Sequence, residues 1–368
     1  MSWEKNQLVN KTTYLKRGIS PKYVEGAGYT IINQKCIRDN RIDFAFAKIC
    51  DGQKTIPEEK ILKKGDILIN STGKGTLGRT AQIKNDLEET LLVDTHITIV
   101  RAAEDVDPFF LGQLIRRNEI VIEALGKGST QQLELSRTDL GEIVLSFPPL
   151  PTQSKIAMIL SAYDDLIENN LKRIRLIEEK ARIEFKTIQK NEKLEFQKAV
   201  KVLQFSTGKL NSNASVVNGL YPFFTCGQEI LRTNTYSLDE EVVLLGGNNA
   251  SAIYPVFYFK GKFDAYQRTY IIKPRSEFYI SFKYLYFFWE DKLDYLKNIS
   301  TGAATKFLTL KILNDIDVPL PNRKVMEEFE NLTDPIFKLK AILVEQNSKL
   351  REARDILLPK LMNGQIEF

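Results

Sequence analysis

The sequence predicts an α/β (α+β) protein with two pseudo-two-fold-related globular domains of short mixed strands, separated by two long antiparallel coiled-coil helices. A Pro-Leu-Pro segment at Pro149–Pro151 recurs at Pro319–Pro321. Each copy is followed by a long stretch whose apolar residues alternate at steps of four and three. The segments that precede the two copies are weakly similar to each other. A repeated helix after a repeated proline stop indicates a duplicated protein.

These markers divide the 368 residues into four segments. We expect a first globular domain over residues 1–148, a first long helix over 149–192, a second globular domain over 193–318 and a second long helix over 319–368. The length exceeds that of a typical single domain. A hydrophobic content of 43% is sufficient for packed cores.

In the first domain, short apolar runs bounded by turn residues predict strands. Proline suits the first position of a helix, so we expect a helix over Pro108–Ala124. The expected strands are Tyr29–Asn33, Ile67–Asn70, Ala81–Ile83, Ile97–Val100 and Ile143–Phe147.

The first long helix follows Pro148 and Pro149, which end the preceding strand because proline cannot donate a ladder hydrogen bond. Asp164 and Asp165 are predicted to interrupt it, so that a short helix and a break precede the long helix. The residues of its expected seam are Ile156, Leu160, Tyr163, Ile167, Asn170, Ile174, Ile177, Ala181, Glu184 and Ile188.

The second domain repeats the order of the first. Val242–Leu245 matches Asp66–Ile69, and Thr269–Lys273 matches Ile97–Arg101. We expect a helix over Tyr279–Leu296, in the place of the helix of the first domain. The clearest matches pair Leu135 with Leu308, Leu140 with Leu313 and Ile143 with Ile316.

The second long helix has a seam of the same spacing. Thr333 and Asp334 stand before Pro335 as an N-cap stands before a first helical residue, which predicts a break here too. Because a narrow apolar stripe needs a partner, we expect the two helices to pack together, with Asn170 and Gln346 fixing their register. The residues of this seam are Val325, Phe329, Leu332, Ile336, Leu339, Leu343, Gln346, Leu350, Ala353 and Leu357.

Composition narrows the class of protein. A net charge of +5 and a pI near 8.8 suit nucleic-acid binding without proving it. Three scattered cysteines and a single histidine, His96, argue against a disulfide framework, a zinc site and a histidine-based triad. No apolar run is long enough to cross a membrane, and the first residues lack a signal-peptide core. We therefore expect a soluble, cytoplasmic protein that does not contact a membrane.

One short glycine-rich motif has more than one interpretation. The GxGxxG pattern at Gly73–Gly78 follows an expected strand, but a dinucleotide site needs a helix at the third glycine. The residues after Gly78 instead suggest another strand. The alternatives are a turn that presents Lys74 and Arg79 to a phosphate backbone, or a turn with no function beyond connecting strands. No P-loop and no catalytic constellation are evident.

Loops rich in amides, hydroxyls and basic side chains recur in both domains. Asn and Gln can bond adenine, Arg and Lys can bond guanine, and Lys or Ser can hold phosphates. Any one of these residues alone is typical of an ordinary surface loop, so the prediction depends on their recurrence. The candidate DNA-binding residues are Gln34, Lys35, Arg38, Ser71, Thr72, Lys74, Arg79, Lys127, Gln131, Lys209, Asn211, Asn248, Asn249, Ser251, Tyr266, Gln267 and Arg268.

These residues lead to a family. The repeated Pro-Leu-Pro and helix (Pro149–Glu179 and Pro319–Leu357) and the C-terminal Leu357–Phe368 resemble the specificity subunit of type I restriction–modification systems. Within the domains, Gly18–Phe44 and Ser206–Ile272 resemble target-recognition domains of that family.

The resemblance implies two target-recognition domains, each reading one half of a bipartite site on double-stranded DNA. The helices would set the spacer and dock two modification subunits, and restriction/translocase subunits would join the complex. S-adenosylmethionine, ATP and Mg²⁺ are then expected on partner subunits, with no cofactor, metal or catalytic residue in this chain. Two alternatives are a tandem coiled-coil scaffold without DNA specificity and a self-contained enzyme that uses the GxGxxG loop.

Overall fold

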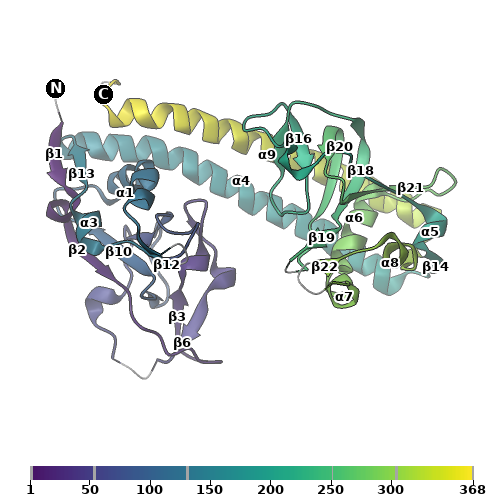
Figure 1. Ribbon diagram of the computed structural model, residues 1–368, viewed down its shortest axis with the longest axis horizontal. Coiled ribbons are helices and arrows are strands. Elements are labelled where there is room, and N and C mark those ends of the chain that lie inside the picture. Colours follow the sequence, from purple (N-terminus) through teal and green to yellow (C-terminus); the bar gives the residue numbers. More distant parts are fainter. Residues whose placement is uncertain (1–2, 53–54, 130–131, 251, 303–305, 367–368) are drawn as a thin grey trace. The chain divides into compact units, whose positions relative to one another are not determined.

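A computed structural model describes residues 3–52, 55–129, 132–250, 252–302 and 306–366 (Figure 1). The chain forms two compact units. Unit 1 comprises residues 1–169 with 346–368, and unit 2 comprises residues 170–345. The division passes through both long helices and not at their ends, because one half of each helix packs on each globular core.

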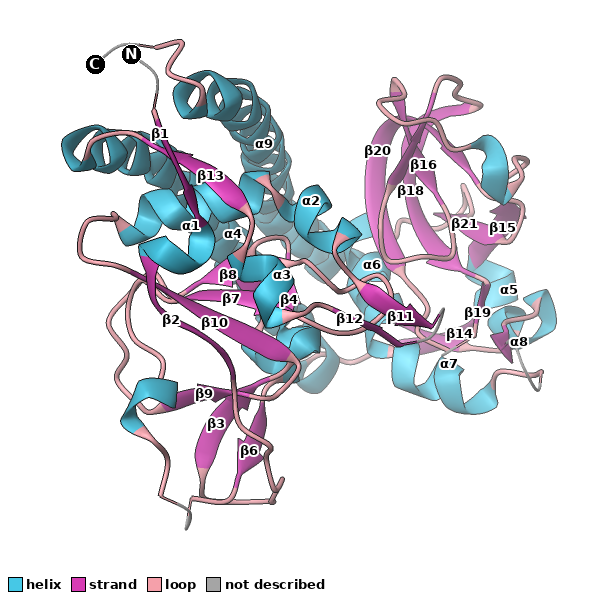
Figure 2. Cartoon of the chain, turned by 60° about the vertical axis from the view of Figure 1, so that its left-hand side comes forward, coloured by secondary structure: helices cyan, strands magenta, loops and turns pink. Residues whose placement is uncertain are grey.

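Among its described residues, unit 1 has two larger sheets and three strand pairs; Figure 2 shows the strands in magenta. The four-stranded antiparallel sheet has the order β2 (Thr12–Arg17), β10 (Ile97–Ala102), β7 (Ile67–Asn70), β8 (Thr80–Gln82). The three-stranded sheet has the order β6 (Lys48–Cys50), β3 (Tyr29–Ile32), β9 (Leu91–Val93). The pairs are β1 (Glu4–Gln7) with β13 (Val144–Phe147), β4 (Ile37–Arg38) with β5 (Arg41–Ile42), and β11 (Lys127–Ser129) with β12 (Gln132–Glu134).

Three α-helices of unit 1 are α1 (Pro108–Arg117), α2 (Glu119–Ala124) and α3 (Arg137–Gly141). The Asp107 carboxylate caps α1 by accepting from the backbone N–H groups of Phe109 and Phe110, each at 3.0 Å. The single helix expected over Pro108–Ala124 is wrong, because Asn118 separates α1 from α2. Its side-chain Nδ2 donates to the carbonyl of Leu114 at 2.7 Å. Short 3₁₀ helices lie at Leu8–Lys11, Gln34–Cys36, Phe44–Phe46 and Glu58–Lys60.

The described part of unit 2 has one large sheet and two strand pairs. The six-stranded sheet has the order β15 (Leu203–Thr207), β21 (Thr269–Pro274), β18 (Leu238–Gly246), β20 (Val256–Ala265), β16 (Tyr221–Phe224), β17 (Leu231–Thr233). The pairs are β14 (Glu195–Lys198) with β23 (Asp317–Leu320) and β19 (Asn248–Asn249) with β22 (Lys306–Phe307). The helices are α5 (Ala199–Val202), α6 (Phe282–Asp291), α7 (Leu293–Ile299), α8 (Leu310–Asn314) and a 3₁₀ turn at Ser212–Ala214.

Several strand pairings of unit 1 are repeated in unit 2 at equivalent residues. Ile67 pairs with Val100 in unit 1, and Val243 pairs with Ile272 in unit 2. These equivalent pairs agree with the matches of Asp66–Ile69 to Val242–Leu245 and of Ile97–Arg101 to Thr269–Lys273. The other ladders repeat in the same way: Arg17–Thr98 with Thr207–Tyr270, Ile32–Val93 with Phe224–Ala265, and Glu4–Phe147 with Glu195–Leu320.

The two long helices, α4 (Leu150–Asn191) and α9 (Arg323–Met362), are each continuous. The predicted breaks are therefore wrong. Asp164 does not end a helix because its carboxylate pairs sideways with Arg116 and Arg354.

The predicted cap before Pro335 also fails for a physical reason. The Thr333 hydroxyl donates back to the carbonyl of Phe329 at 2.7 Å, within the helix. The Asp334 carboxylate is paired with the buried Lys283 Nζ at 2.6 Å, and Glu330 contacts the same Nζ at 2.5 Å. Both side chains are thus engaged elsewhere, and the helix continues through the proline.

The seam of α9 departs from the expected spacing in its second half. Phe329, Ile336 and Leu343 are buried as expected, but Gln346 and Ala353 are exposed. Buried in their place are Asn347 and Arg354, one residue further along. On α4 the buried seam residues are Ile156, Leu160, Ile167, Asn170, Ile174, Ala181 and Ile188. The remaining expected seam positions, Tyr163, Ile177, Glu184, Val325, Leu332, Leu339, Leu350 and Leu357, are half-buried.

The helices run antiparallel within each unit. In unit 1 Arg354 Nη1 lies 2.7 Å from Asp164 Oδ1, and Asn347 Nδ2 lies 3.4 Å from the carbonyl of Ile167. Numbers therefore rise along α4 as they fall along α9. In unit 2 Lys340 pairs with Glu178, while Phe185 and Phe329 both pack on Tyr284.

Each unit has its own core on its half of the helix pair. The core of unit 1 joins Phe110 and Phe147 to Leu160 of α4 and Leu361 of α9. The core of unit 2 is rich in aromatic side chains, and Tyr284, Phe287 and Trp289 of α6 are fully buried there. Along the parts of the chain that the structure describes, no helix is long and apolar enough to cross a membrane.

Candidate nucleic-acid interface

In unit 2, backbone hydrogen bonds gather four loops into one cluster. The N–H of Gly247 donates to the carbonyl of Arg268 at 2.8 Å, and the N–H of Gln267 donates to the carbonyl of Leu210 at 2.9 Å. The amide of Asn249 reaches the carbonyl of Cys226 at 3.4 Å. Four segments that lie far apart in sequence therefore end at one place, and they carry Lys209, Asn211, Asn248, Tyr266 and other candidate residues.

The same bonds build an equivalent cluster in unit 1. The N–H of Ser71 donates to the carbonyl of His96 at 2.8 Å, as Gly247 donates to Arg268. The N–H of Leu135 donates to Ser71 at 2.8 Å, as Leu308 donates to Gly247. His96 and Arg268 thus occupy equivalent positions. By the same frame Thr72 corresponds to Asn248, and Gln34 corresponds to Cys226.

The side chains of the unit 1 cluster form a chain of hydrogen bonds. The Thr72 hydroxyl donates to Gln34 Oε1 at 3.0 Å and lies 2.7 Å from His96 Nδ1. Because this hydroxyl has one hydrogen, His96 Nδ1 must be the donor to Thr72. The tautomer with its hydrogen on Nδ1 leaves His96 Nε2 as an acceptor, and Gln34 presents its Nε2 as a donor.

The side chains of the unit 2 cluster offer different chemistry. The guanidinium of Arg268 lies 5.4 Å from the centroid of the Phe307 ring, a cation–π contact. Gln267 is exposed beside it, and so are Lys209 and Asn211. Asn248 Oδ1 is enclosed and has no hydrogen-bond partner among the described residues. This cluster therefore presents the cations of Arg268 and Lys209 beside amide groups that can both donate and accept.

Exposed cations surround the unit 1 cluster. Lys35, Lys74 and Arg79 are exposed, and none of them has an ion-pair partner within the described ranges. Arg38 packs on the Phe46 ring, with its guanidinium carbon 4.7 Å from the centroid. Lys127 pairs with a carboxylate of α3, Asp139, at 2.7 Å.

The glycine-rich pattern is a hairpin turn. Strands β7 and β8 pair antiparallel on either side of it, with Ile69 opposite Thr80, and no helix opens after Gly78. Gly73 and Gly75 have φ values of 96° and 75°, which side-chain-bearing residues rarely adopt. A dinucleotide site at this loop is therefore wrong. The turn carries Lys74 at its exposed tip.

Some predicted site residues are not available to a ligand. Ser71 is fully buried, and its Oγ lies 2.6 Å from Thr98 Oγ1 and 3.2 Å from the carbonyl of Ile69. Its assignment to the DNA-binding set is wrong, because the side chain points into the core. Gln131 and Ser251 lie outside the described residues.

The sequence reasoning missed His96 and Phe307. In the sequence a lone histidine suggests only a metal ligand or a catalytic base, although His96 stands immediately before the buried strand β10. Phe307 gives no signal without the structure that brings it under Arg268. Throughout the described ranges, no group of three or more His, Cys, Asp or Glu side chains could hold a metal ion.

Comparisons with known proteins agree on one family. The family model described as "Type I restriction modification DNA specificity domain" matches residues 8–179 and again residues 188–340. The EcoDI specificity subunit of Escherichia coli is 31% identical over 169 residues, which is 45% of this chain and 37% of that protein. A putative specificity subunit, MjaX of Methanocaldococcus jannaschii, is 24% identical over 408 residues, covering 99% of this chain and 93% of that protein.

A solved structure has the same fold. The S subunit of a type I restriction–modification system from M. genitalium matches with a TM-score of 0.60 at 17% identity. The match covers 98% of this chain and 96% of that chain. Two consecutive matches to one family model agree with the repeated strand register described above.

Proposed function

Because the chain belongs to the specificity-subunit family of type I restriction–modification systems, we propose that it is a DNA-recognition subunit whose two units each read one half of a bipartite site. The family is the non-catalytic recognition component of these systems. Each loop cluster enters the major groove, where every base pair offers a distinct pattern of donors and acceptors.

One observation carries this proposal. The two clusters share the same backbone frame and differ in the side chains that it presents. Unit 1 offers the acceptor His96 Nε2 beside the donor Gln34 Nε2, whereas unit 2 offers the guanidinium of Arg268. A common frame with exchanged hydrogen-bonding groups suits two modules that bind the same kind of ligand and select different sequences.

The roles follow from the chemistry of the bases. The forked guanidinium of Arg268 suits the O6 and N7 acceptors of guanine, and Gln267 suits adenine. His96 Nε2 suits an exocyclic amino group of cytosine or adenine. Lys74 and Arg79 neutralise phosphates and carry no sequence information.

The partners follow from the long helices. We infer that α4 and α9 set the spacer between the half-sites and dock two modification subunits. S-adenosylmethionine then belongs to those subunits, and ATP and Mg²⁺ belong to restriction/translocase subunits. Exposed apolar side chains on α4 support docking: Met158 and Leu166 in unit 1, and Leu176 and Ile183 in unit 2.

The test is to sequence the methylome of cells that express the chain with its modification subunit. We expect a bipartite methylated motif for the natural chain. His96→Ala relaxes the motif in one half only, and Arg268→Ala relaxes the other half only. Each loss costs about 1–3 kcal/mol of discrimination against the wrong base, as for a bidentate contact.

Arg323→Ala is the matched control, because Arg323 is exposed on α9 and paired with Glu327 at 2.8 Å. Its methylome should equal that of the natural chain. If His96→Ala and Arg268→Ala relaxed the same half-site, the assignment of these two residues to different half-sites would be wrong. A natural chain that yields no bipartite motif, and that does not bind random duplex at low salt, would instead favour a scaffold.

A further inference from the structure

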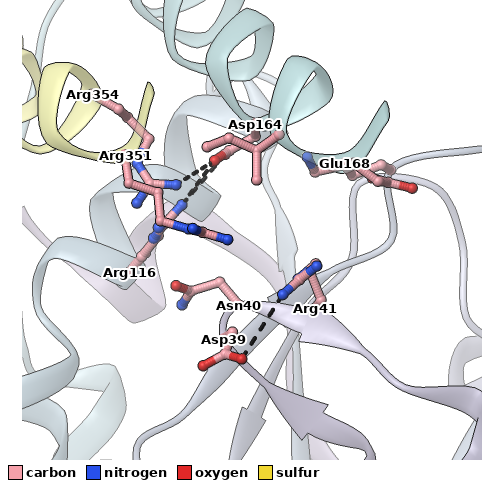
Figure 3. A pocket seen from close by; sticks show the side chains of 10 residues that line it. Asp39, Asn40, Arg41, Arg116, Asp164, Glu168, Arg351 and Arg354 are labelled. Carbon is pink, nitrogen blue, oxygen red and sulfur yellow. Dashed lines mark hydrogen bonds and ion pairs between the residues drawn. The ribbon is translucent and has the colours of Figure 1, made fainter. Parts of the chain in front are cut away.

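Unit 1 contains a charged pocket of about 360 Å³. Its lining residues do not include Gln34, Thr72 or His96 of the loop cluster described above, which is called the reading cluster from here on. The pocket is enclosed by the tip of the β4–β5 hairpin, the end of α1, and facing turns of α4 and α9 (Figure 3). Five cationic side chains line it and only three carboxylates do: Arg41, Lys84, Arg116, Arg351 and Arg354 against Asp39, Asp164 and Glu168. The pocket therefore has a surplus of positive charge.

The carboxylate of Asp164 forms ion pairs with two of these cations. Asp164 accepts from Arg354 Nη1 at 2.7 Å and from Arg116 Nη1 at 3.2 Å. Gln113 Nε2 completes this cluster at 2.8 Å. All three charged side chains are largely buried, so they stabilise the fold of the pocket wall and are not free to bind a ligand.

Arg351 differs from its neighbours. It has no ion-pair or hydrogen-bond partner among the residues that the structure describes, although it lines the pocket. Arg351 is exposed to solvent, but partial desolvation, together with the like charges of Arg41 and Arg354, lowers its pKa below the ordinary value. Arg41 has only a long contact with the exposed Asp39, at 3.8 Å. Two guanidinium groups thus face the pocket without a strong counter-charge.

The hairpin that carries Arg41 is held in place. Asn40, in the left-handed region at φ 57°, donates to Thr80 Oγ1 at 3.1 Å and to Glu119 Oε1 at 2.6 Å. The same Glu119 oxygen accepts from the N–H of Thr80 at 3.0 Å. These bonds fix the hairpin tip to β8 and α2, so less ordering is required when a ligand binds.

We propose that this pocket binds a phosphate group of the DNA backbone, with Arg351 and Arg41 as paired forks and Lys84 as a third cation. Guanidinium groups match the geometry of a phosphate oxygen pair. This inference rests on the proposed function, because the phosphate belongs to the duplex that unit 1 reads.

The path of the chain favours DNA as the source of the phosphate. From Gln34 in the reading cluster the chain runs directly to Arg41 in the pocket, and Lys35 and Arg38 lie between them. Seven residues span at most about 25 Å. A duplex advances that far in about seven base pairs. The contacted phosphate therefore lies beside the first half-site and contributes affinity without sequence information.

The first experiment measures binding of the full chain to a duplex with its methylated motif and to a random duplex, over a range of salt concentrations. Arg351→Ala should weaken binding to both duplexes by the same factor. It should also reduce the slope of log K against log salt by about 1. Arg351→Lys should retain part of the affinity, because it keeps the charge and loses the fork. The matched control Arg323→Ala should leave affinity and slope unchanged.

The second experiment replaces single phosphates by neutral methylphosphonates along the duplex. One position beside the first half-site should weaken binding of the natural chain and have no further effect on Arg351→Ala. Absence of such coupling at every position, in a variant that keeps the melting temperature of the natural chain, overturns the DNA assignment. A calorimetric titration with inorganic phosphate then tests whether the pocket binds a phosphate that does not belong to DNA.

The two experiments distinguish failure of the proposed function from failure of the phosphate pocket. If the natural chain binds no duplex, the proposed function fails, and the pocket is judged by the phosphate titration alone. Phosphate binding that Arg351→Ala abolishes, without methylphosphonate coupling, assigns the pocket to a free phosphate and overturns the DNA source. If Arg351→Ala instead weakens only the assembly with modification subunits, the ligand is a carboxylate of a partner and the proposal is wrong.

Discussion

The exposed cations of the β7–β8 turn show how one side chain can affect affinity without affecting sequence preference. Lys74 and Arg79 stand on a hairpin next to the reading cluster and have no described ion-pair partner. Lys74→Ala and Arg79→Ala should each weaken binding to every duplex and flatten the salt dependence by about one unit of slope. A mobility assay with motif-bearing and random duplexes measures this. A variant that lost only motif binding would contradict the phosphate role.

The buried Asp164 gives stability a defined dependence on pH. Burial alone would raise the pKa of Asp164, but Arg116, Lys84 and Arg354 outweigh it and hold the pKa below its ordinary value. A carboxylate with a lower pKa in the folded state stabilises the fold above its unfolded pKa of about 4. That contribution is lost as the pH falls through the folded-state pKa.

Asp164→Asn should therefore lower the free energy of unfolding of unit 1 by about 3–5 kcal/mol at pH 7, because two buried arginines lose their counter-charge. The deficit should shrink as the pH approaches 3. Urea unfolding at several pH values measures it. The neighbouring Asp165→Asn is the control, since Asp165 is exposed and has one long contact with Lys84 at 3.4 Å. A deficit independent of pH would refute the ionic role.

At the residue scale, the sequence could not show which side chains face a ligand. Ser71 and Thr72 are adjacent, yet only Thr72 reaches the cluster, because alternate residues of an extended chain point to opposite sides. Which of the two side chains faces the core depends on how β7 pairs with β10, a strand some thirty residues further along the chain. His96 becomes a candidate only when β10 brings it beside Thr72.

At the scale of elements, the second half of α9 departs from its heptad spacing. Asn347 is 1% exposed, whereas Gln346 is exposed. Asn347→Ala should lower the free energy of unfolding by about 1–3 kcal/mol, because a buried amide and its packing are lost. Gln346→Ala should change it by less than about 0.5 kcal/mol. Thermal unfolding of both variants measures the difference, and equal effects would contradict the shifted seam.

Strands were easier to predict than helix interruptions. The apolar run Ile67–Asn70 is fully buried, and the match of Asp66–Ile69 to Val242–Leu245 agrees with the pairing that the two units share. The breaks predicted in α4 and α9 failed because Asp and Thr cap a helix only when their side chains are free to accept from backbone N–H groups. Here tertiary partners such as Lys283 engage them, and no local pattern reveals such partners.

At the scale of the whole molecule, the proposed spacer role makes a quantitative prediction. Seven residues inserted into α4 after Asn169 and into α9 after Glu345, where the two units meet in sequence, preserve both seams. They lengthen each helix by about 10 Å. The methylated motif should gain about three base pairs between its half-sites, with both half-sites unchanged. Methylome sequencing gives the answer, and an altered half-site would refute the spacer role.

The two ends of the described chain have a consequence of their own. Trp3 and Gly364 lie together in unit 1, where a Cβ on Gly364 would be 3.2 Å from Trp3 Nε1. Strand β14 of unit 2 is equivalent to β1 of unit 1, because each pairs with the strand that precedes a long helix. In unit 2 the chain runs directly from the end of α4 into β14, whereas in unit 1 the end of α9 and the start of β1 are the two chain ends. A gene that joined the present ends and began between residues 191 and 195 would encode the same recognition surfaces in circularly permuted order.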